Sequence, residues 1–483
     1  MRPERLAAVF MQYSSKFIAD PSNLRLGRLR YAVKRAIDRG PFGQGGRSGG
    51  LPRPDDALPA TALALCTALA VAAAVLLPPY PPLQDFIEWI YQAEILARLP
   101  PEAWPPGVHV ATYPVPNSLF QLVLTTLALA MPALAAGKLF LIAYTAATAA
   151  LAWGLARRYQ PGTTLAVTAV LLVSFCFNTP FWDGYANYQT GLLIFMAWLL
   201  LPEKRQASPA LILLFGIATF FAHAMAFVAF AILVGLQALT DRRLHATMLA
   251  LAPSLLLAAW YVLGKDLPDV GGQEASVPYV AVKAYTLTKL GPYHNLVFET
   301  GGDAALRPIL YGVGISLNLL YTAGLLAAVG WGLWTSIQRR TLPVAPVLAA
   351  LLLGALFLRL PQQGSAEVNP GEQLACPALL LLLLFLPLPR QLTQLLGTSV
   401  LMLLLSLATL AAGPQPWWSA VSPTGPHALT TASQVLFWHR PTAFVCKWQE
   451  VQRLAGGQEA ARIPITFQTS LLVGAGGQEC NPG

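Results

Sequence analysis

Long apolar runs recur along this chain and constrain its fold more than any other feature. The first run, residues 57–78, contains no charged side chain. A helix of about 20 apolar residues crosses the roughly 30 Å hydrocarbon core of a bilayer. The runs are continuous rather than alternating, which predicts helices and not barrel strands. Charged residues make up 11% of the chain, against about 25% in a typical soluble protein. The sequence therefore predicts an all-α polytopic membrane protein.

We predict eleven transmembrane helices from these runs. They cover residues 57–78, 137–156, 162–178, 187–201, 209–221, 225–240, 246–263, 308–334, 343–360, 373–389 and 394–412. Basic residues fall on every second connecting loop, at Arg157–Arg158, Lys204–Arg205, Arg242–Arg243, Arg339–Arg340 and Arg390. Under the positive-inside rule, these loops are expected in the cytoplasm.

The first 56 residues form a basic arm, with eleven Arg and Lys against five Asp and Glu. The positive-inside rule explains this arm as a cytoplasmic N-terminus. Nucleic-acid binding is a less economical explanation, so we expect no nucleic-acid partner. No apolar core follows at the distance typical of a signal peptide. The remaining loops then face outward, which in a bacterium means the periplasmic side of the inner membrane.

Two apolar segments do not fit a simple crossing count. Residues 117–137 are apolar enough to span, but a span here would move Arg157–Arg158 outside. We therefore predict a re-entrant or interfacial hairpin bent at Pro132, with a full span as the alternative. The pair 209–221 and 225–240 is short for two spans. It predicts a thin hairpin whose tip, "FFAH", lies in the outer half of the bilayer.

The C-terminal stretch, residues 413–483, is more polar and is expected to form a small periplasmic domain. It contains Cys446 and Cys480, whereas the other three cysteines fall inside apolar spans. Because exported segments meet an oxidising compartment, we predict a disulfide between these two cysteines. Two free thiols are the alternative.

Three carboxylates follow the first span, in "PPLQDFIEWIYQAEIL" at residues 81–96. At 100° per residue, Asp85, Glu88 and Gln92 share one stripe of a helix. This pattern predicts an amphipathic helix at the outer membrane surface, with its polar stripe facing a cavity. A capping box formed by Asp85 and Glu88 is the structural alternative, although it leaves Gln92 unexplained.

This layout resembles the GT-C superfamily of integral membrane glycosyltransferases. The resemblance rests on a cytoplasmic N-terminus, one span, and an outer loop that opens with the acidic residue Asp85 on a juxtamembrane helix. The segments "PFWDGYANYQTGLL" and "FFAH" also resemble later parts of bacterial members. The family often has two neighbouring acidic residues, whereas here the second, Glu88, lies one turn away.

The resemblance implies transfer of a sugar from a polyprenyl-phosphate carrier to a glycan, lipid or protein acceptor on the outer side. Asp85 and Glu88 are then the candidate catalytic residues, with a carboxylate deprotonating the acceptor hydroxyl. Polar and basic residues of the outer loops 79–136 and 264–307 and of the outer helix ends would bind the substrate. The candidates are Gln92, Asp183, Tyr185, Asn187, His223, His294, Arg307 and Arg359.

Each of these binding candidates also has a structural explanation. Asp183, Tyr185 and Asn187 suit an interfacial turn with aromatics, and His223 suits a satisfied neutral histidine. His294 and Arg307 suit a solvated loop. Arg359 suits a side chain that reaches toward lipid headgroups.

No nucleotide-, zinc- or serine-hydrolase motif is present in the sequence, so no cofactor is predicted, and a divalent metal stays open. Two other functions are considered beside the glycosyltransferase. One is a non-catalytic scaffold subunit that binds protein partners through the N-terminal arm or the C-terminal domain. The other is a transporter or flippase, for which the near absence of charges within the spans gives little support.

Overall fold

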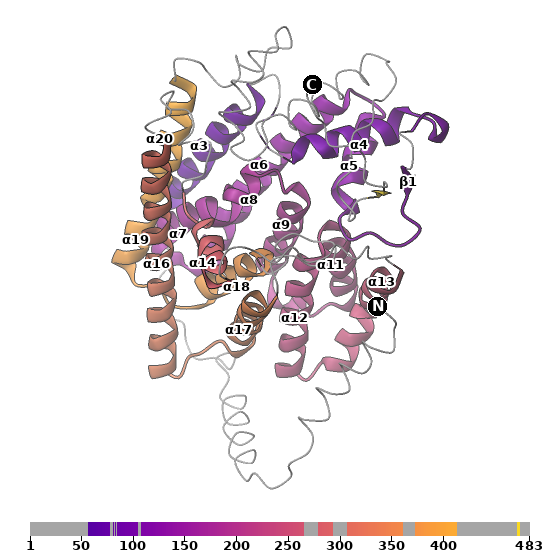
Figure 1. Cartoon of the computed structure of the whole chain (residues 1–483). Helices are drawn as coiled ribbons and strands as arrows, with labels where there is room; N and C mark the ends of the chain where they lie inside the picture. Colours follow the sequence, from indigo (N-terminus) through magenta and orange to yellow (C-terminus); the bar gives the residue numbers. More distant parts are fainter. Residues whose placement is uncertain are drawn as a thin grey trace. The chain divides into compact units, whose positions relative to one another are not determined.

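The computed structural model describes residues 57–77, 81, 83, 85–104, 108–264, 279–292, 307–360, 372–412 and 471–473. In this part of the chain the structure is helical apart from one pair of two-residue strands (Figure 1). The prediction of an all-α protein is therefore confirmed. The predicted cytoplasmic arm 1–56 and most of the C-terminal stretch 413–483 lie outside the described residues.

The N-terminal half contains α3 (Ala57–Leu76), α4 (Phe86–Arg98), η2 (Pro101–Ala103), β1 (His109–Val110), α5 (Ser118–Ala128), α6 (Ala133–Tyr159), η3 (Pro161–Thr163), α7 (Thr164–Leu171), the π-helical turn η4 (Leu172–Cys176), α8 (Thr179–Trp182), α9 (Ala186–Leu200) and α10 (Glu203–Gln206). The rest contains α11 (Pro209–Ala222), α12 (Ala224–Thr240), α13 (Leu244–Gly264), α14 (Tyr279–Thr288), α16 (Arg307–Gln338), α17 (Val344–Arg359), α18 (Glu372–Phe385), α19 (Arg390–Gly397), α20 (Ser399–Ala412) and β2 (Leu472–Val473).

Four helices of the described residues are long and apolar enough to cross a membrane. They are Leu58–Leu76, Ala133–Tyr159, Leu244–Gly264 and Ser316–Gln338. The other predicted spans coincide with shorter helices, several of only 14 to 17 residues. Eleven crossings therefore stay a prediction, while the helical character of each predicted span is confirmed.

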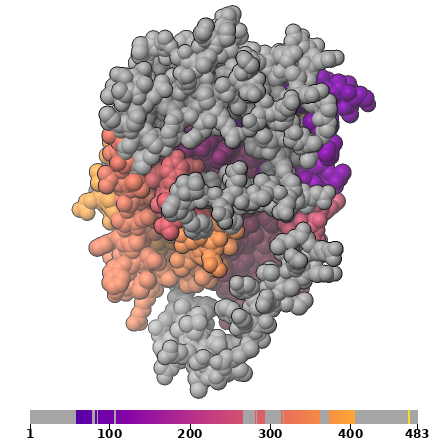
Figure 2. All heavy atoms as spheres, in the orientation of Figure 1, coloured from indigo at the N-terminus to yellow at the C-terminus, as the bar shows by residue number. Residues whose placement is uncertain are grey.

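Large apolar side chains are exposed along the long helices, including Leu249 and Trp260 on α13 and Leu320 and Trp334 on α16. Figure 2 shows α16, in orange, along one edge of the molecular surface. Extended apolar surface is rare on soluble monomers and normal where a protein faces lipid.

Hydrogen bonds show which helix ends lie on the same side. At one side, Arg158 Nη1 donates to Leu200 O (2.8 Å), and Gln160 Nε2 donates to Leu386 O (2.7 Å). The C-terminal ends of α6, α9 and α18 therefore lie together. At the other side, Tyr188 Oη donates to Gln373 O (3.0 Å), which joins the N-terminal ends of α9 and α18. These pairings agree with the alternation predicted from the basic loops.

The segment 117–137 forms a helix, a break and the start of a second helix. The helix α5 has 11 residues, which rise about 16 Å, roughly half of a bilayer core. Pro132 occupies the N-cap of α6, so the predicted bend is present. The short pair 209–221 and 225–240 likewise appears as α11 and α12, which break at His223.

The strands join two distant parts of the chain. Residues His109 and Val110 of β1 pair antiparallel with Val473 and Leu472 of β2. The C-terminal strand therefore lies on the same side as the loop 79–136. That this side is periplasmic stays a prediction.

Candidate functional site

The start of α4 docks on the turn between α8 and α9. The backbone N–H of Asp85 donates to Asp183 O at 2.9 Å. The next residue, Gly184, has a φ of 82°, and a Cβ there would lie 2.6 Å from Phe86 N. A glycine is required because only it combines this dihedral with so close a backbone approach. Two acidic residues almost a hundred positions apart are thus brought together by their backbones.

The carboxylate of Asp85 does not cap α4. The residue occupies the N-cap position, but its backbone is helical and its side chain makes no capping hydrogen bond. In a capping box, the N-cap side chain accepts a hydrogen bond from a backbone N–H of the first helical turn. The Asp85 side chain makes no such bond, so the capping-box interpretation is wrong in its main feature. Asp85 is half-buried, and Glu88, one turn later, is buried.

Both faces of α4 are covered by protein, and its predicted place at a membrane surface stays a prediction. Every residue from Phe86 to Ile95 is buried. The amphipathic pattern is real, but its polar side chains find partners inside the protein instead of facing water. Among them, Gln92 is 1% exposed and accepts a hydrogen bond from the side chain of Gln121.

Sequence reasoning missed Gln121, which is fully buried on α5. The available signal was its position as a polar side chain within the apolar run "LFQLVL". Buried amides are retained where both their donor and acceptor groups find partners. Gln121 Oε1 accepts from the backbone N–H of Leu471 at 2.8 Å, so both its groups are bonded.

The third carboxylate of the opening stretch, Glu94, has a structural role. Its Oε2 accepts from Ala133 N (3.3 Å) at the first turn of α6, and its Oε1 lies 2.7 Å from Arg98 Nε. A carboxylate at a helix N-terminus is stabilised by unpaired N–H groups and by the helix dipole. Asp85 and Glu88 therefore remain the site candidates of the acidic cluster, whereas Glu94 joins α4 to the start of α6.

A buried polar network fixes the turn that receives Asp85. Asn178 Oδ1 accepts from Phe181 N (3.3 Å), which caps α8, and from Gln189 Nε2 (2.7 Å) on α9. Tyr144 Oη lies 2.9 Å from both Cys176 O and Gln189 Oε1. The Cys176 carbonyl ends the π-helical turn η4, a feature that often marks functional sites.

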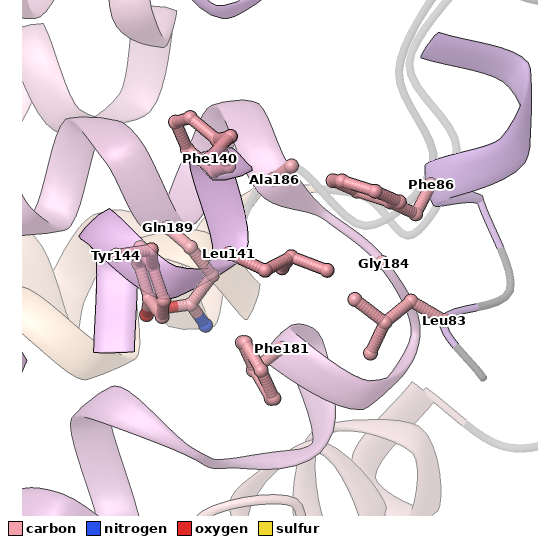
Figure 3. A pocket seen from close by; sticks show the side chains of 9 residues that line it. All are labelled: Leu83, Phe86, Phe140, Leu141, Tyr144, Phe181, Gly184, Ala186 and Gln189. Carbon is pink, nitrogen blue, oxygen red and sulfur yellow. The ribbon is translucent and has the colours of Figure 1, made fainter. Parts of the chain in front are cut away.

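A small apolar cavity lies beside this turn. Figure 3 shows Leu83 and Phe86 at one end and Tyr144 beside Gln189 at the other. The remaining lining residues are Phe140, Leu141, Phe181, Gly184 and Ala186. The cavity holds about 10 Å³, which is room for roughly one water molecule. In this state it does not admit a sugar.

Asn187 lies on α9, and His223 packs against the same helix. Asn187 is in its first turn and is 5% exposed. The His223 ring packs edge-on against Tyr188, with ring centroids 5.3 Å apart. A Cβ on Gly191 would lie 3.0 Å from His223 Cβ, so α9 approaches the tip of the α11–α12 hairpin closely. His223 Nδ1 accepts from Met225 N (3.2 Å), which supports the structural alternative for this histidine.

Tyr185 occupies the N-cap of α9 and is half-buried, directly after the Asp183–Gly184 turn. The structure thus gathers Asp85, Asp183, Tyr185 and Asn187 around the start of α9.

The other candidates are separate from this group or are not described. Arg359 is exposed at the end of α17, which fits an outward-pointing side chain. Arg307 is the first residue of α16. His294, Cys446 and Cys480 lie outside the described residues. In the described part of the chain, no three His, Cys, Asp or Glu side chains gather to hold a metal ion.

Comparisons with protein-family models, with curated proteins and with solved structures gave no match for this chain.

Proposed function

We propose that the chain is a membrane glycosyltransferase that moves a sugar from a polyprenyl-phosphate carrier to an acceptor on the outer, periplasmic side of a bacterial inner membrane. The proposal rests on the resemblance of its layout to the GT-C superfamily. One observation supports it most: the start of α4 docks on the turn before α9, so the half-buried Asp85 lies beside Asp183.

In the proposed reaction, the Asp85 carboxylate accepts the proton of an acceptor hydroxyl while the hydroxyl oxygen attacks the anomeric carbon. The bond from that carbon to the carrier oxygen breaks, and the carrier phosphate leaves with the electron pair. Glu88 is the second carboxylate within one turn, and Asp183, Tyr185 and Asn187 would contact the sugar or the acceptor. The acceptor is a glycan, a lipid or a protein.

A non-catalytic scaffold subunit is the second candidate. The small volume of the cavity beside the Asp85 turn, about 10 Å³, favours it. An enzyme of the proposed kind requires the cavity beside Asp85 to widen when the sugar and its carrier bind. A scaffold subunit requires no such cavity.

Asp85→Asn tests the proposal. Membranes containing the wild type or the variant are supplied with radiolabelled polyprenyl-phosphate sugars, and transfer of label to endogenous acceptors is measured. The amide keeps the shape of the side chain but cannot accept the proton, so we expect a loss of at least about a hundredfold. Glu102→Gln is the matched control, because Glu102 is exposed in the same loop, and it should keep full activity.

Full activity of Asp85→Asn at normal protein levels would end the catalytic assignment. If wild-type membranes transfer no more label than membranes lacking the protein, with any of the sugars supplied, the scaffold is favoured instead.

A further inference from the structure

The C-terminal strand is anchored on the outer loop by backbone and side-chain contacts. Beside the β1–β2 pairing, Ala111 N donates to Leu471 O at 2.8 Å. Leu472 is fully buried and belongs to the main hydrophobic core. A two-residue ladder alone is too short to be stable in water. Burial of Leu472 therefore contributes much of the free energy of docking.

The side chain of Gln121 links this strand to α4. The Gln121 amide makes one hydrogen bond to each segment. Its Oε1 accepts from Leu471 N, and its Nε2 donates to Gln92 Oε1. Both glutamines are buried, at 0% and 1% exposure. Gln92 lies on the same stripe of α4 as Asp85 and Glu88, two turns from the helix start.

The link makes docking of the strand and placement of α4 interdependent. A buried amide oxygen without a donor raises the free energy of the folded state, because its hydrogen bonds to water are lost and no protein donor replaces them. When the strand leaves, Gln121 Oε1 loses its partner, and the side chain must rotate or admit water. Either change disturbs the bond to Gln92, which is a direct polar contact between α5 and α4.

We propose that Gln121 is a positioning residue that couples the docked strand 471–473 to the polar stripe of α4. With the strand docked, Gln121 holds Gln92 and thereby the helix that begins at Asp85. The effect on sugar transfer rests on the proposed function, whereas the coupling itself does not.

Docking is measured first, in the full chain in nanodiscs. His109 and Val473 are directly paired. In the double variant His109→Cys, Val473→Cys, the two cysteine Cβ atoms therefore lie about 5 Å apart, which permits a disulfide. Mass spectrometry of the cross-linked peptide distinguishes this bond from bonds to native cysteines. We expect Gln121→Leu to lower the cross-linking yield at least about threefold, since Leu471 N loses its acceptor. Gln121→Glu keeps an acceptor and should retain most of the yield.

Coupling is then measured by hydrogen exchange of the α4 amides. Leu472→Ala weakens docking without changing α4, α5 or Gln121. If the strand and α4 are coupled, exchange of residues 86–98 should rise about tenfold in both Leu472→Ala and Gln121→Leu, and stay unchanged in Glu102→Gln. Reduced cross-linking in Leu472→Ala with unchanged α4 exchange would overturn the proposal. Unchanged cross-linking in Gln121→Leu would overturn it as well.

Transfer activity supplies the last measurement. We expect Gln121→Leu to raise the KM for the polyprenyl-phosphate sugar more than it lowers kcat. Gln121→Glu keeps the acceptor for Leu471 N but has no N–H to donate to Gln92 Oε1, so it should raise the KM in the same way while the strand stays docked. A general loss of folded protein would not divide KM from kcat in this way, so a lower kcat at an unchanged KM would overturn the positioning role. If wild-type protein transfers no sugar but the exchange results hold, the proposed function fails and the coupling stands.

Discussion

Gly184 is the position where one added methyl group should disturb the candidate site most directly. Its φ of 82° is unfavourable for other residues, and a Cβ would lie 2.6 Å from Phe86 N and 2.7 Å from Asp85 N. Both neighbours are backbone atoms, which cannot move aside by changing rotamer. In Gly184→Ala, the turn must therefore separate from the start of α4.

The magnitude follows from two contributions. A non-glycine residue in the left-handed region costs about 1 to 2 kcal/mol. Separation of the two segments also breaks the 2.9 Å hydrogen bond from Asp85 N to Asp183 O, a loss of about 1 kcal/mol. We expect a destabilisation of about 2 to 3 kcal/mol, which for a chain of 483 residues corresponds to a Tm lower by roughly 2 to 3 °C.

The assay is thermal unfolding of purified protein in one detergent, with three variants compared. Asn tolerates the left-handed region better than Ala does, but it adds the same Cβ. Because the close approach remains, Gly184→Asn should recover only part of the loss. Gly235→Ala is the control, because a Cβ there meets nothing within 4 Å; as a helical Gly→Ala change it should stabilise slightly.

A wild-type Tm in Gly184→Ala would refute the close approach between this turn and α4. Full recovery in Gly184→Asn would instead assign the whole effect to the dihedral angle.

Three further predictions concern the surroundings of the site. Glu94→Gln should lower the free energy of unfolding by about 1 to 3 kcal/mol, because it removes a charged helix cap and a buried ion-pair partner; exposed Glu102→Gln should change it by less than about 0.5 kcal/mol, and equal effects would contradict the structural role of Glu94. Tyr144→Phe removes one buried hydroxyl and should cost about 1 to 2 kcal/mol in the same denaturation assay, so an unchanged stability would argue against the polar network. Peptide mapping without reductant should find Cys446 joined to Cys480, and labelling of either thiol only from the cytoplasm would reverse the predicted side of the C-terminal stretch.

The sequence determined the helices well, because apolar length and composition are local properties. Each predicted span coincides with one or more helices, and the break at Pro132 follows from the proline itself. The basic loops also predicted which helix ends share a side, since charge distribution depends on the loops alone. The hydrogen bonds from Arg158 and Gln160 agree with that prediction.

Only the tertiary structure decided what the polar residues of α4 do. Sequence periodicity placed Asp85, Glu88 and Gln92 on one stripe, but it could not show that the stripe is buried. The partners lie too far along the chain: Glu94 reaches Ala133, 39 residues away, and Gln121 meets Leu471, 350 residues away. A helical pattern specifies which side chains share a face, whereas the groups that satisfy them are brought there by packing of distant segments.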